Sequence, residues 1–197
     1  MAIKLYKRNA TYLKGVCIAV ILLFCFALVY TVNGNVEATQ RQEAQIDDTT
    51  YFQDFSLSGL NGEQFTSEDV AEHKLTIVNA WAPWCGPCVG EMPDLETLYE
   101  GLDNDEIMLV GVVADYTTTE EANYDSQIED KVASTGVEYP IMVADQKFTD
   151  EMLPLTGGGI PCTWAIDQDG KIIGMISGSR DLETWQTQVD EWLKEVS

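Results

Sequence analysis

Basic residues are scarce in this chain. Its 197 residues include 11 Lys and Arg against 33 Asp and Glu, which gives a formal net charge of −22. After Ala38 only seven basic residues remain against 32 acidic ones, so this part carries a formal charge of −25. Such a charge argues against nucleic acid and anionic lipid headgroups as partners of this part. It leaves open a solvated acidic surface, a basic partner protein or a salty habitat.

Histidine and cysteine are also few, which limits metal chemistry. The chain has one histidine, His73, and five cysteines, of which Cys85, Cys88 and Cys162 follow Ala38. A structural zinc site takes four such ligands, but the sequence has only one Cys-x-x-Cys pair there and no His-x-x-x-His pair. His73 and Cys162 are the only residues left to complete a site. No Cys-x-x-Cys-His motif for haem attachment is present, and we expect neither a metal nor another cofactor.

One long segment lacks charge altogether. Gly15–Val36 contains 22 residues without a charged side chain, and roughly 20 apolar residues suffice to cross the hydrocarbon core of a bilayer. Residues 1–14 carry four basic residues and no acid, which predicts a cytoplasmic N-terminus and places the rest of the chain outside the cytoplasm. We predict a single transmembrane anchor over residues 15–36. A signal peptide cleaved after Ala38 is the alternative.

The remainder divides into a polar linker, residues 37–50, and one domain, residues 51–197. Apolar and polar residues alternate around Asn61-Gly62, a dipeptide typical of hairpin turns. Buried strands and amphipathic helices then alternate, and a second hairpin precedes a last helix that begins near Asp181. This order predicts an α/β fold with a mixed central sheet flanked by helices. The expected elements are strands at 74–81, 106–115, 139–145, 162–167 and 171–177, and helices at 86–102, 118–136 and from 181 onward.

Cys85 and Cys88 admit three interpretations: a redox pair, half of a metal site or a structural staple. A disulfide across so short a loop removes little entropy from the unfolded chain, so it is a poor staple. The pair follows a buried strand and opens a helix, where unpaired backbone N–H groups and the helix dipole stabilise a thiolate. Strand, Trp-Cys-Gly-Pro-Cys and helix together favour a redox pair.

The stretch "WCGPC", followed five residues later by Pro93, resembles thioredoxin. Three longer stretches resemble the membrane-anchored thioredoxin-like reductases of the TlpA/ResA type: "YFQDFSLSGLNGEQFTSEDV", "NAWAPWCGPCVGEMPDLETLYE" and "GIPCTWAIDQDGKIIGMISG". The resemblance covers residues 51–197. It implies a thioredoxin-like fold with an N-terminal β-hairpin extension and a cis peptide bond at Ile160-Pro161.

The same resemblance assigns a candidate proton carrier. Thioredoxin has a buried Asp six residues before its first cysteine, and Asn79, which cannot titrate, occupies that position here. The TlpA/ResA-type proteins often have Asn there and Glu three residues after the second cysteine, which is Glu91 in this sequence. We hypothesise that Glu91 takes the proton of Cys88. The alternative is an ordinary first-turn acid that complements the helix dipole.

Three further positions are candidate substrate contacts. The resemblance implies that Pro161 lies opposite Cys85, and the backbone of Ile160 would then pair with an extended substrate segment. Trp84 would form an apolar patch beside Cys85. Cys162 departs from the family pattern, in which Thr is usual after the cis-proline. We interpret it as a buried small residue, with a third redox thiol as the alternative.

These features predict an extracytoplasmic thiol–disulfide oxidoreductase. Cys85 attacks a disulfide of a partner protein, and Cys88 resolves the mixed disulfide. By resemblance the direction is reduction, with electrons from a membrane thiol carrier and with disulfides of exported proteins as substrates. The alternatives are a disulfide oxidase or isomerase, a peroxiredoxin-like peroxidase, and a membrane-tethered module that binds a basic partner without catalysis.

Overall fold

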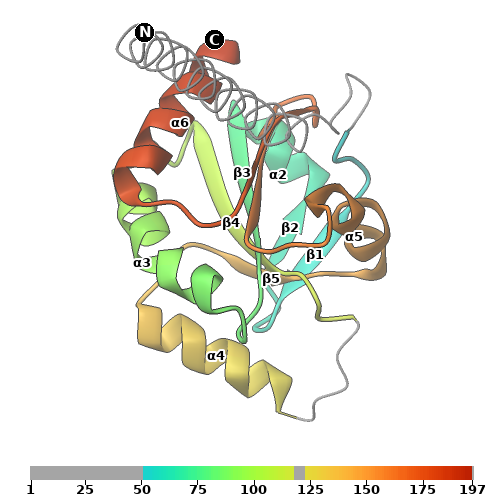
Figure 1. Cartoon of the computed structure of the whole chain (residues 1–197). Coiled ribbons are helices and arrows are strands. Elements are labelled where there is room, and N and C mark those ends of the chain that lie inside the picture. The colour runs from blue at the N-terminus through green and yellow to red at the C-terminus, as the bar shows by residue number, and fades with distance from the viewer. Residues whose placement is uncertain (1–50, 118–122, 197) are drawn as a thin grey trace, which may run out of the picture. The chain divides into compact units, whose positions relative to one another are not determined.

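Seven strands form one mixed sheet in the order β2-β1-β5-β4-β3-β6-β7 (Figure 1). The structure, a computed structural model, describes residues 51–117 and 123–196. Strands β3, β4 and β5 run parallel to one another, whereas β1, β2, β6 and β7 each pair antiparallel with their neighbours. The strands are β1 (Ser56–Gly59), β2 (Gln64–Thr66), β3 (Leu75–Trp81), β4 (Ile107–Val113), β5 (Ile141–Val143), β6 (Cys162–Asp167) and β7 (Ile172–Ser177).

The predicted N-terminal hairpin is confirmed as β1 and β2. Leu57 pairs with Phe65 across it, and both side chains are buried. Gly62 has a φ of 89°, which only glycine adopts without strain. Through β1 the hairpin joins β5 in antiparallel pairing, so it extends the main sheet rather than forming a separate unit.

Strand β3 lies between β4 and β6 near the centre of the sheet, and all seven of its residues are buried. In its register Asn79 stands beside Gly111 of β4 on one side and Thr163 of β6 on the other. Side chains of neighbouring residues in register point to the same face of a sheet. The sequence pattern of β3 therefore places Asn79 and Trp81 on one face and Val78 and Ala80 on the other.

Helices cover both faces of the sheet (Figure 1). Helices α3 (Gly86–Gly101), α4 (Tyr124–Thr135) and α6 (Leu182–Glu195) pack on the face that carries Trp81. Helices α2 (Ser67–Glu72) and α5 (Gln146–Glu151), with the 3₁₀ turn η1 (Leu153–Thr156), pack on the opposite face. The predicted α/β architecture, with helices on both sides of a mixed sheet, is confirmed.

The helix ends follow from local sequence signals. Asp181 caps α6, because its carboxylate accepts a hydrogen bond from the N–H of Thr184. Gly136 ends α4 in the left-handed conformation, with a φ of 71°. Helix α3 begins directly after Cys85, whose sulfur accepts from the N–H of Cys88 at 3.3 Å. The cysteine pair therefore occupies the N-terminal cap and first turn of a 16-residue helix.

The predicted membrane anchor, residues 15–36, lies outside the described residues, as do the flanking residues 1–14 and 37–50. Within residues 51–117 and 123–196, no helix is long and apolar enough to cross a bilayer.

Candidate active site

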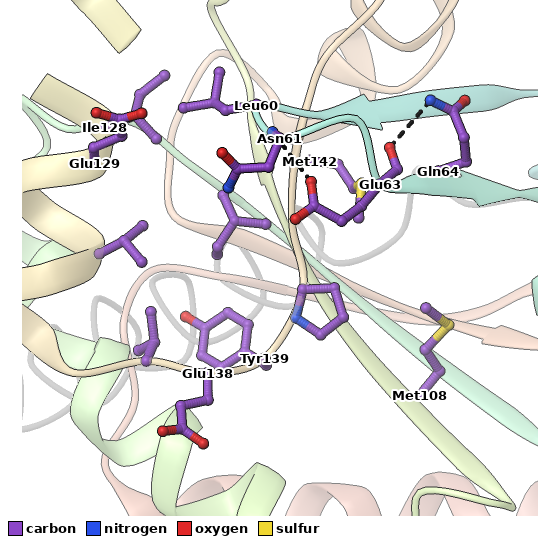
Figure 2. A pocket seen from close by; sticks show the side chains of 14 residues that line it. Leu60, Asn61, Glu63, Gln64, Met108, Ile128, Glu129, Glu138, Tyr139 and Met142 are labelled. Carbon is purple, nitrogen blue, oxygen red and sulfur yellow. Dashed lines mark hydrogen bonds between the residues drawn. The ribbon is translucent and has the colours of Figure 1, made fainter. Parts of the chain in front are cut away.

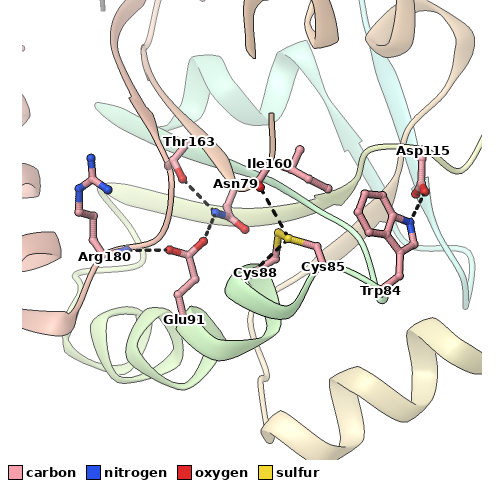
Figure 3. Close-up of a disulfide and its surroundings, with 9 residues drawn as sticks. All are labelled: Asn79, Trp84, Cys85, Cys88, Glu91, Asp115, Ile160, Thr163 and Arg180. Carbon is pink, nitrogen blue, oxygen red and sulfur yellow. Dashed lines mark hydrogen bonds between the residues drawn. A yellow bond between two sulfur atoms is a disulfide. The ribbon is translucent and has the colours of Figure 1, made fainter. Parts of the chain in front are cut away.

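Cys85 and Cys88 form a disulfide at the start of α3 (Figure 3). Cys85 is 5% exposed and Cys88 is 1% exposed, so Cys85 is the more accessible residue of the two. The chain enters the pair from the end of β3 through the turn that holds Trp84. This is the strand, cysteine pair and helix arrangement that the sequence predicts.

Glu91 lies one turn beyond Cys88 on the same side of α3, and it is only 2% exposed. Asn79 Nδ2 donates a hydrogen bond to Glu91 Oε1 at 3.1 Å, and the backbone N–H of Arg180 donates to Oε2 at 3.1 Å. Thr163 Oγ1 accepts the second hydrogen bond of the same Asn79 amide, at 2.9 Å. Figure 3 shows the three side chains and Arg180 joined in one network.

Burial raises the pKa of Glu91 from 4.5 to about 7. The hydrogen bonds from Arg180 and Asn79 and the charge of Arg180 oppose this rise, and the charge of Asp94 adds to it. A carboxyl group with this pKa changes protonation readily near neutral pH. Glu91 lies in the second turn of α3 and the first turn contains no acid, so an exposed first-turn acid does not describe it.

The predicted cis peptide bond between Ile160 and Pro161 is present. The carbonyl oxygen of Ile160 lies 3.7 Å from Cys85 Sγ (Figure 3). The preceding glycines, Gly157–Gly159, are exposed, and no neighbouring atom would obstruct a side chain at any of them. An exposed loop therefore leads directly into Ile160, whose carbonyl lies beside Cys85 Sγ.

Trp84 is 65% exposed next to Cys85. Its indole N–H donates to Asp115 Oδ2 at 2.6 Å, and the hydroxyl of Tyr124 donates to the other oxygen of Asp115. Asp115 thus ties the active-site turn to the first turn of α4. Sequence reasoning missed this restraint because Asp115 lies 31 residues after Trp84.

Cys162 is the one predicted site residue that the fold separates from the others. It is fully buried on the sheet face of α2 and α5, whereas Cys85 and Cys88 lie on the opposite face. Burial raises the pKa of its thiol to about 12, and a hydrogen bond with Ser177 opposes that rise. The neighbouring Thr163 points toward the cysteine pair instead, since successive strand residues face opposite ways.

The described residues contain no group of three or more His, Cys, Asp or Glu side chains that could hold a metal ion. A cavity of about 400 Å³ opens between the hairpin turn, α4 and the segment before β5 (Figure 2). Its wall includes Leu60, Ile128 and Tyr139, and neither cysteine of the pair lines it. The cavity is therefore separate from the disulfide.

Comparison with known proteins agrees with this geometry. The model of the Redoxin family matches residues 47–190. The chain is 24% identical over 180 residues to "Thiol-disulfide oxidoreductase ResA" of Bacillus cereus, with 91% of this chain and 94% of the relative covered. It is 28% identical over 165 residues to the protein of the same name from Geobacillus thermodenitrificans, which covers 83% and 87% of the two chains.

A solved structure confirms the thioredoxin-like fold. StoA from Bacillus subtilis superimposes with a TM-score of 0.53 at 24% identity, and the match covers 70% of this chain and 94% of StoA. The family match extends over most of the chain, and the relatives carry one enzymatic name. The chain therefore belongs to the Redoxin family, as a thiol–disulfide oxidoreductase.

Proposed function

We propose that this oxidoreductase reduces disulfides of exported proteins and that Cys85 and Cys88 are its reactive pair. The observation that carries the proposal is the contrast between the two sulfurs. Cys85 is the more accessible residue, and its sulfur accepts a hydrogen bond from a backbone N–H. Cys88 is buried close to the carboxyl group of Glu91, whose pKa is about 7. Such an arrangement suits one sulfur to attack and the other to resolve.

In the first step the Cys85 thiolate attacks one sulfur of the substrate disulfide. A Cys85–substrate bond forms, the substrate disulfide breaks, and its second sulfur leaves as a thiolate that takes a proton from water. The N–H of Cys88, 3.3 Å from Cys85 Sγ in the oxidised protein, favours the thiolate form of Cys85.

In the second step Cys88 must lose its proton inside the protein, since water has little access to it. The Glu91 carboxylate accepts that proton, and the Cys88 thiolate then attacks Cys85 Sγ. The Cys85–Cys88 disulfide forms, the bond to the substrate breaks, and the substrate leaves with two more electrons than it brought. A dithiol donor at the membrane then reduces the pair again, as the resemblance to the TlpA/ResA type implies.

Substrate backbone would bind along the segment before β6. The Ile160 carbonyl lies 3.7 Å from Cys85 Sγ, so an extended segment that pairs with Ile160 would hold its own cysteine against that sulfur. Pro161 would fix the direction of this segment, and the exposed ring of Trp84 would contact substrate side chains on the other side of the disulfide.

We also propose that residues 15–36 anchor the domain in a membrane, with residues 1–14 in the cytoplasm, 37–50 as a linker and 51–197 outside the cytoplasm. The uncharged segment and the basic residues before it support this topology. The location fits the direction of the reaction, because exported proteins are the ones that acquire disulfides.

Trapping of the mixed disulfide tests the assigned roles. Cys88→Ser should accumulate a covalent complex with a single-disulfide model protein, because nothing resolves the first bond. Cys85→Ser should accumulate none. A complex that forms through Cys88 in the Cys85→Ser variant, at a rate like that of the Cys88→Ser variant, would overturn the assignment.

A further inference from the structure

Three buried polar groups in the core between the sheet and α3, α4 and α6 have no hydrogen-bond partner among the described residues. They are Trp81 Nε1, the hydroxyl of Tyr139 and Trp185 Nε1. Tyr139 precedes β5 and lines the cavity between α4 and the hairpin turn (Figure 2). A buried donor without a partner destabilises the folded protein, and such groups commonly bind an internal water.

The rings of Trp81 and Tyr139 both lie against Gly111 of β4. A Cβ atom at Gly111 would lie 3.2 Å from Trp81 Nε1 and 3.2 Å from Tyr139 Cε2. The missing side chain of Gly111 thus makes room for both rings. Gly111 stands in register with Asn79 on the neighbouring strand, and Asn79 is the residue that holds Glu91. Trp81 and Tyr139 therefore border the Glu91 network.

Helix α3 holds Tyr139 in this place. Glu96 Oε2 accepts hydrogen bonds from the backbone N–H groups of Glu138 and Tyr139, at 2.7 and 3.3 Å. Burial, and then the charges of Glu91 and Glu96, raise the pKa of Tyr139. The hydroxyl thus keeps its proton at every working pH, and it stays a hydrogen-bond donor close enough to Glu91 to be affected by its charge.

We propose that Tyr139 is a positioning residue for the Glu91 carboxylate, to which its hydroxyl and Trp81 Nε1 are joined through one shared buried water. The inference rests on the proposed role of Glu91 as the acceptor of the Cys88 proton. Hydrogen bonds donated toward a carboxylate favour its ionised form. Tyr139 thus keeps Glu91 ionised, and ready to accept a proton, closer to neutral pH than burial alone would allow.

The groups that face Glu91 come from four elements, and Tyr139 adds to them. Asn79 of β3 donates to Glu91 and binds Thr163 of β6, and neither carries a charge. Arg180, between β7 and α6, favours the ionised form, and Asp94 of α3 disfavours it. Cys88 of α3 is in the disulfide and does not titrate in the oxidised protein. The oxidised protein therefore allows Glu91 to be followed without a second titrating group in the pair.

The test is a ¹³C NMR titration of the Glu91 carboxyl carbon in the oxidised full chain in detergent micelles, with the signal assigned by Glu91→Gln. Burial, Asn79, Arg180 and Asp94 alone give Glu91 a pKa of about 7, so with Tyr139 acting as proposed the wild-type midpoint is expected below pH 7. Tyr139→Phe keeps the ring and removes the hydroxyl, so the midpoint should rise by about one pH unit. Tyr99→Phe is the matched control: Tyr99 packs against Tyr139 with ring centroids 6.1 Å apart, and its loss of a hydroxyl should leave the midpoint in place.

An unchanged or lowered midpoint in Tyr139→Phe would overturn the proposal, as would an equal rise in Tyr99→Phe. A second measurement needs no variant: a ROESY spectrum of the wild-type protein should show a cross-peak of NOE sign between water and the Trp81 indole proton, and its absence would also overturn the proposal. If Glu91→Gln does not slow resolution, the proposed function of Glu91 fails. A shifted midpoint in Tyr139→Phe would in that case still show that Tyr139 acts on the pKa of Glu91. Failure of the role of Glu91 and failure of the role of Tyr139 are therefore distinguishable.

Discussion

Asn79 and Glu91 meet beside the Cys85–Cys88 disulfide, where the amide of Asn79 donates to the carboxylate of Glu91 at 3.1 Å. Asn79 comes from the central strand β3 and Glu91 from the helix that carries the cysteines. The hydrogen bond therefore fixes the carboxylate relative to the sheet while α3 fixes it relative to Cys88. A proton acceptor restrained from both sides suits a reaction in which the resolving thiol is shielded from water.

Glu91→Gln should slow the resolving step by about 100-fold, because a positioned acid or base typically contributes between 10² and 10⁴ in rate. The glutamine keeps the shape but accepts no proton, and its single amide oxygen can accept from only one of the two donors, Asn79 Nδ2 and the Arg180 N–H. Stopped-flow measurement of mixed-disulfide decay in the purified chain gives this rate. Glu100→Gln, an exposed position on the same helix, is the matched control and should decay at the wild-type rate. Equal rates for wild type and Glu91→Gln would refute the role of Glu91.

The stability of the oxidised protein should fall as pH rises from about 4.5 to 7 through the contribution of Glu91. The folded protein keeps its proton up to about pH 7, whereas the unfolded chain loses it near 4.5, so folding is favoured most at the acid end of this window. A shift of this size corresponds to about 3 kcal/mol in the free energy of unfolding.

Urea unfolding at several pH values should therefore show a decline in wild type that Glu91→Gln lacks. At pH 8 the variant should be the more stable of the two, because it removes a buried charge. Parallel curves for the two proteins between pH 4.5 and 8 would contradict the raised pKa of Glu91.

Trp84→Ala should raise KM for a protein disulfide by about tenfold, since exposed tryptophans at interfaces often carry that much binding energy. The rate with a small disulfide such as oxidised glutathione should change little, because the indole N–H of Trp84 binds Asp115, whereas Glu91 is held by Asn79 and Arg180. Steady-state kinetics with both substrates measures the contrast. Tyr51→Ala, which truncates the other exposed large hydrophobic side chain among the described residues, should leave both KM values in place.

Cys162→Ser should leave dithiol turnover intact. The side chain is buried on the sheet face opposite the reactive pair, and its raised pKa keeps it a neutral thiol. Serine places a hydroxyl of similar size where Ser177 can share a hydrogen bond with it. Turnover of the wild type and the variant, measured in the same buffer, checks this expectation. Altered kinetics of the variant in oxidising buffer would contradict it and would indicate that Cys162 forms a regulatory disulfide with Cys85.

Local signals made much of the fold predictable. Asn61-Gly62 marked the first hairpin, Gly136 the end of α4 and Asp181 the start of α6, since each acts through its own backbone or its nearest neighbours. The cysteine pair was equally local, because a strand, a short turn, the Cys-x-x-Cys motif and a helix follow each other in the chain.

Contacts between distant segments could not be read in this way. The N–H of Arg180 reaches Glu91 across 89 residues, and Asp115 reaches Trp84 across 31, and neither pair has a spacing that a pattern reveals. The cis bond at Ile160-Pro161 was expected from family resemblance alone. The orientation of Cys162 away from the pair follows from the register of β6, which is set by its pairing with β3.

The reduction potential of the Cys85–Cys88 pair tests the proposed direction of the reaction most directly. Equilibration of the purified chain in thiol redox buffers, followed by quantification of the free thiols, gives this value. The proposal predicts a potential near −270 mV or below, the range of a thioredoxin-like electron donor. A value near −120 mV would identify an oxidant that introduces disulfides and would contradict the reductase assignment.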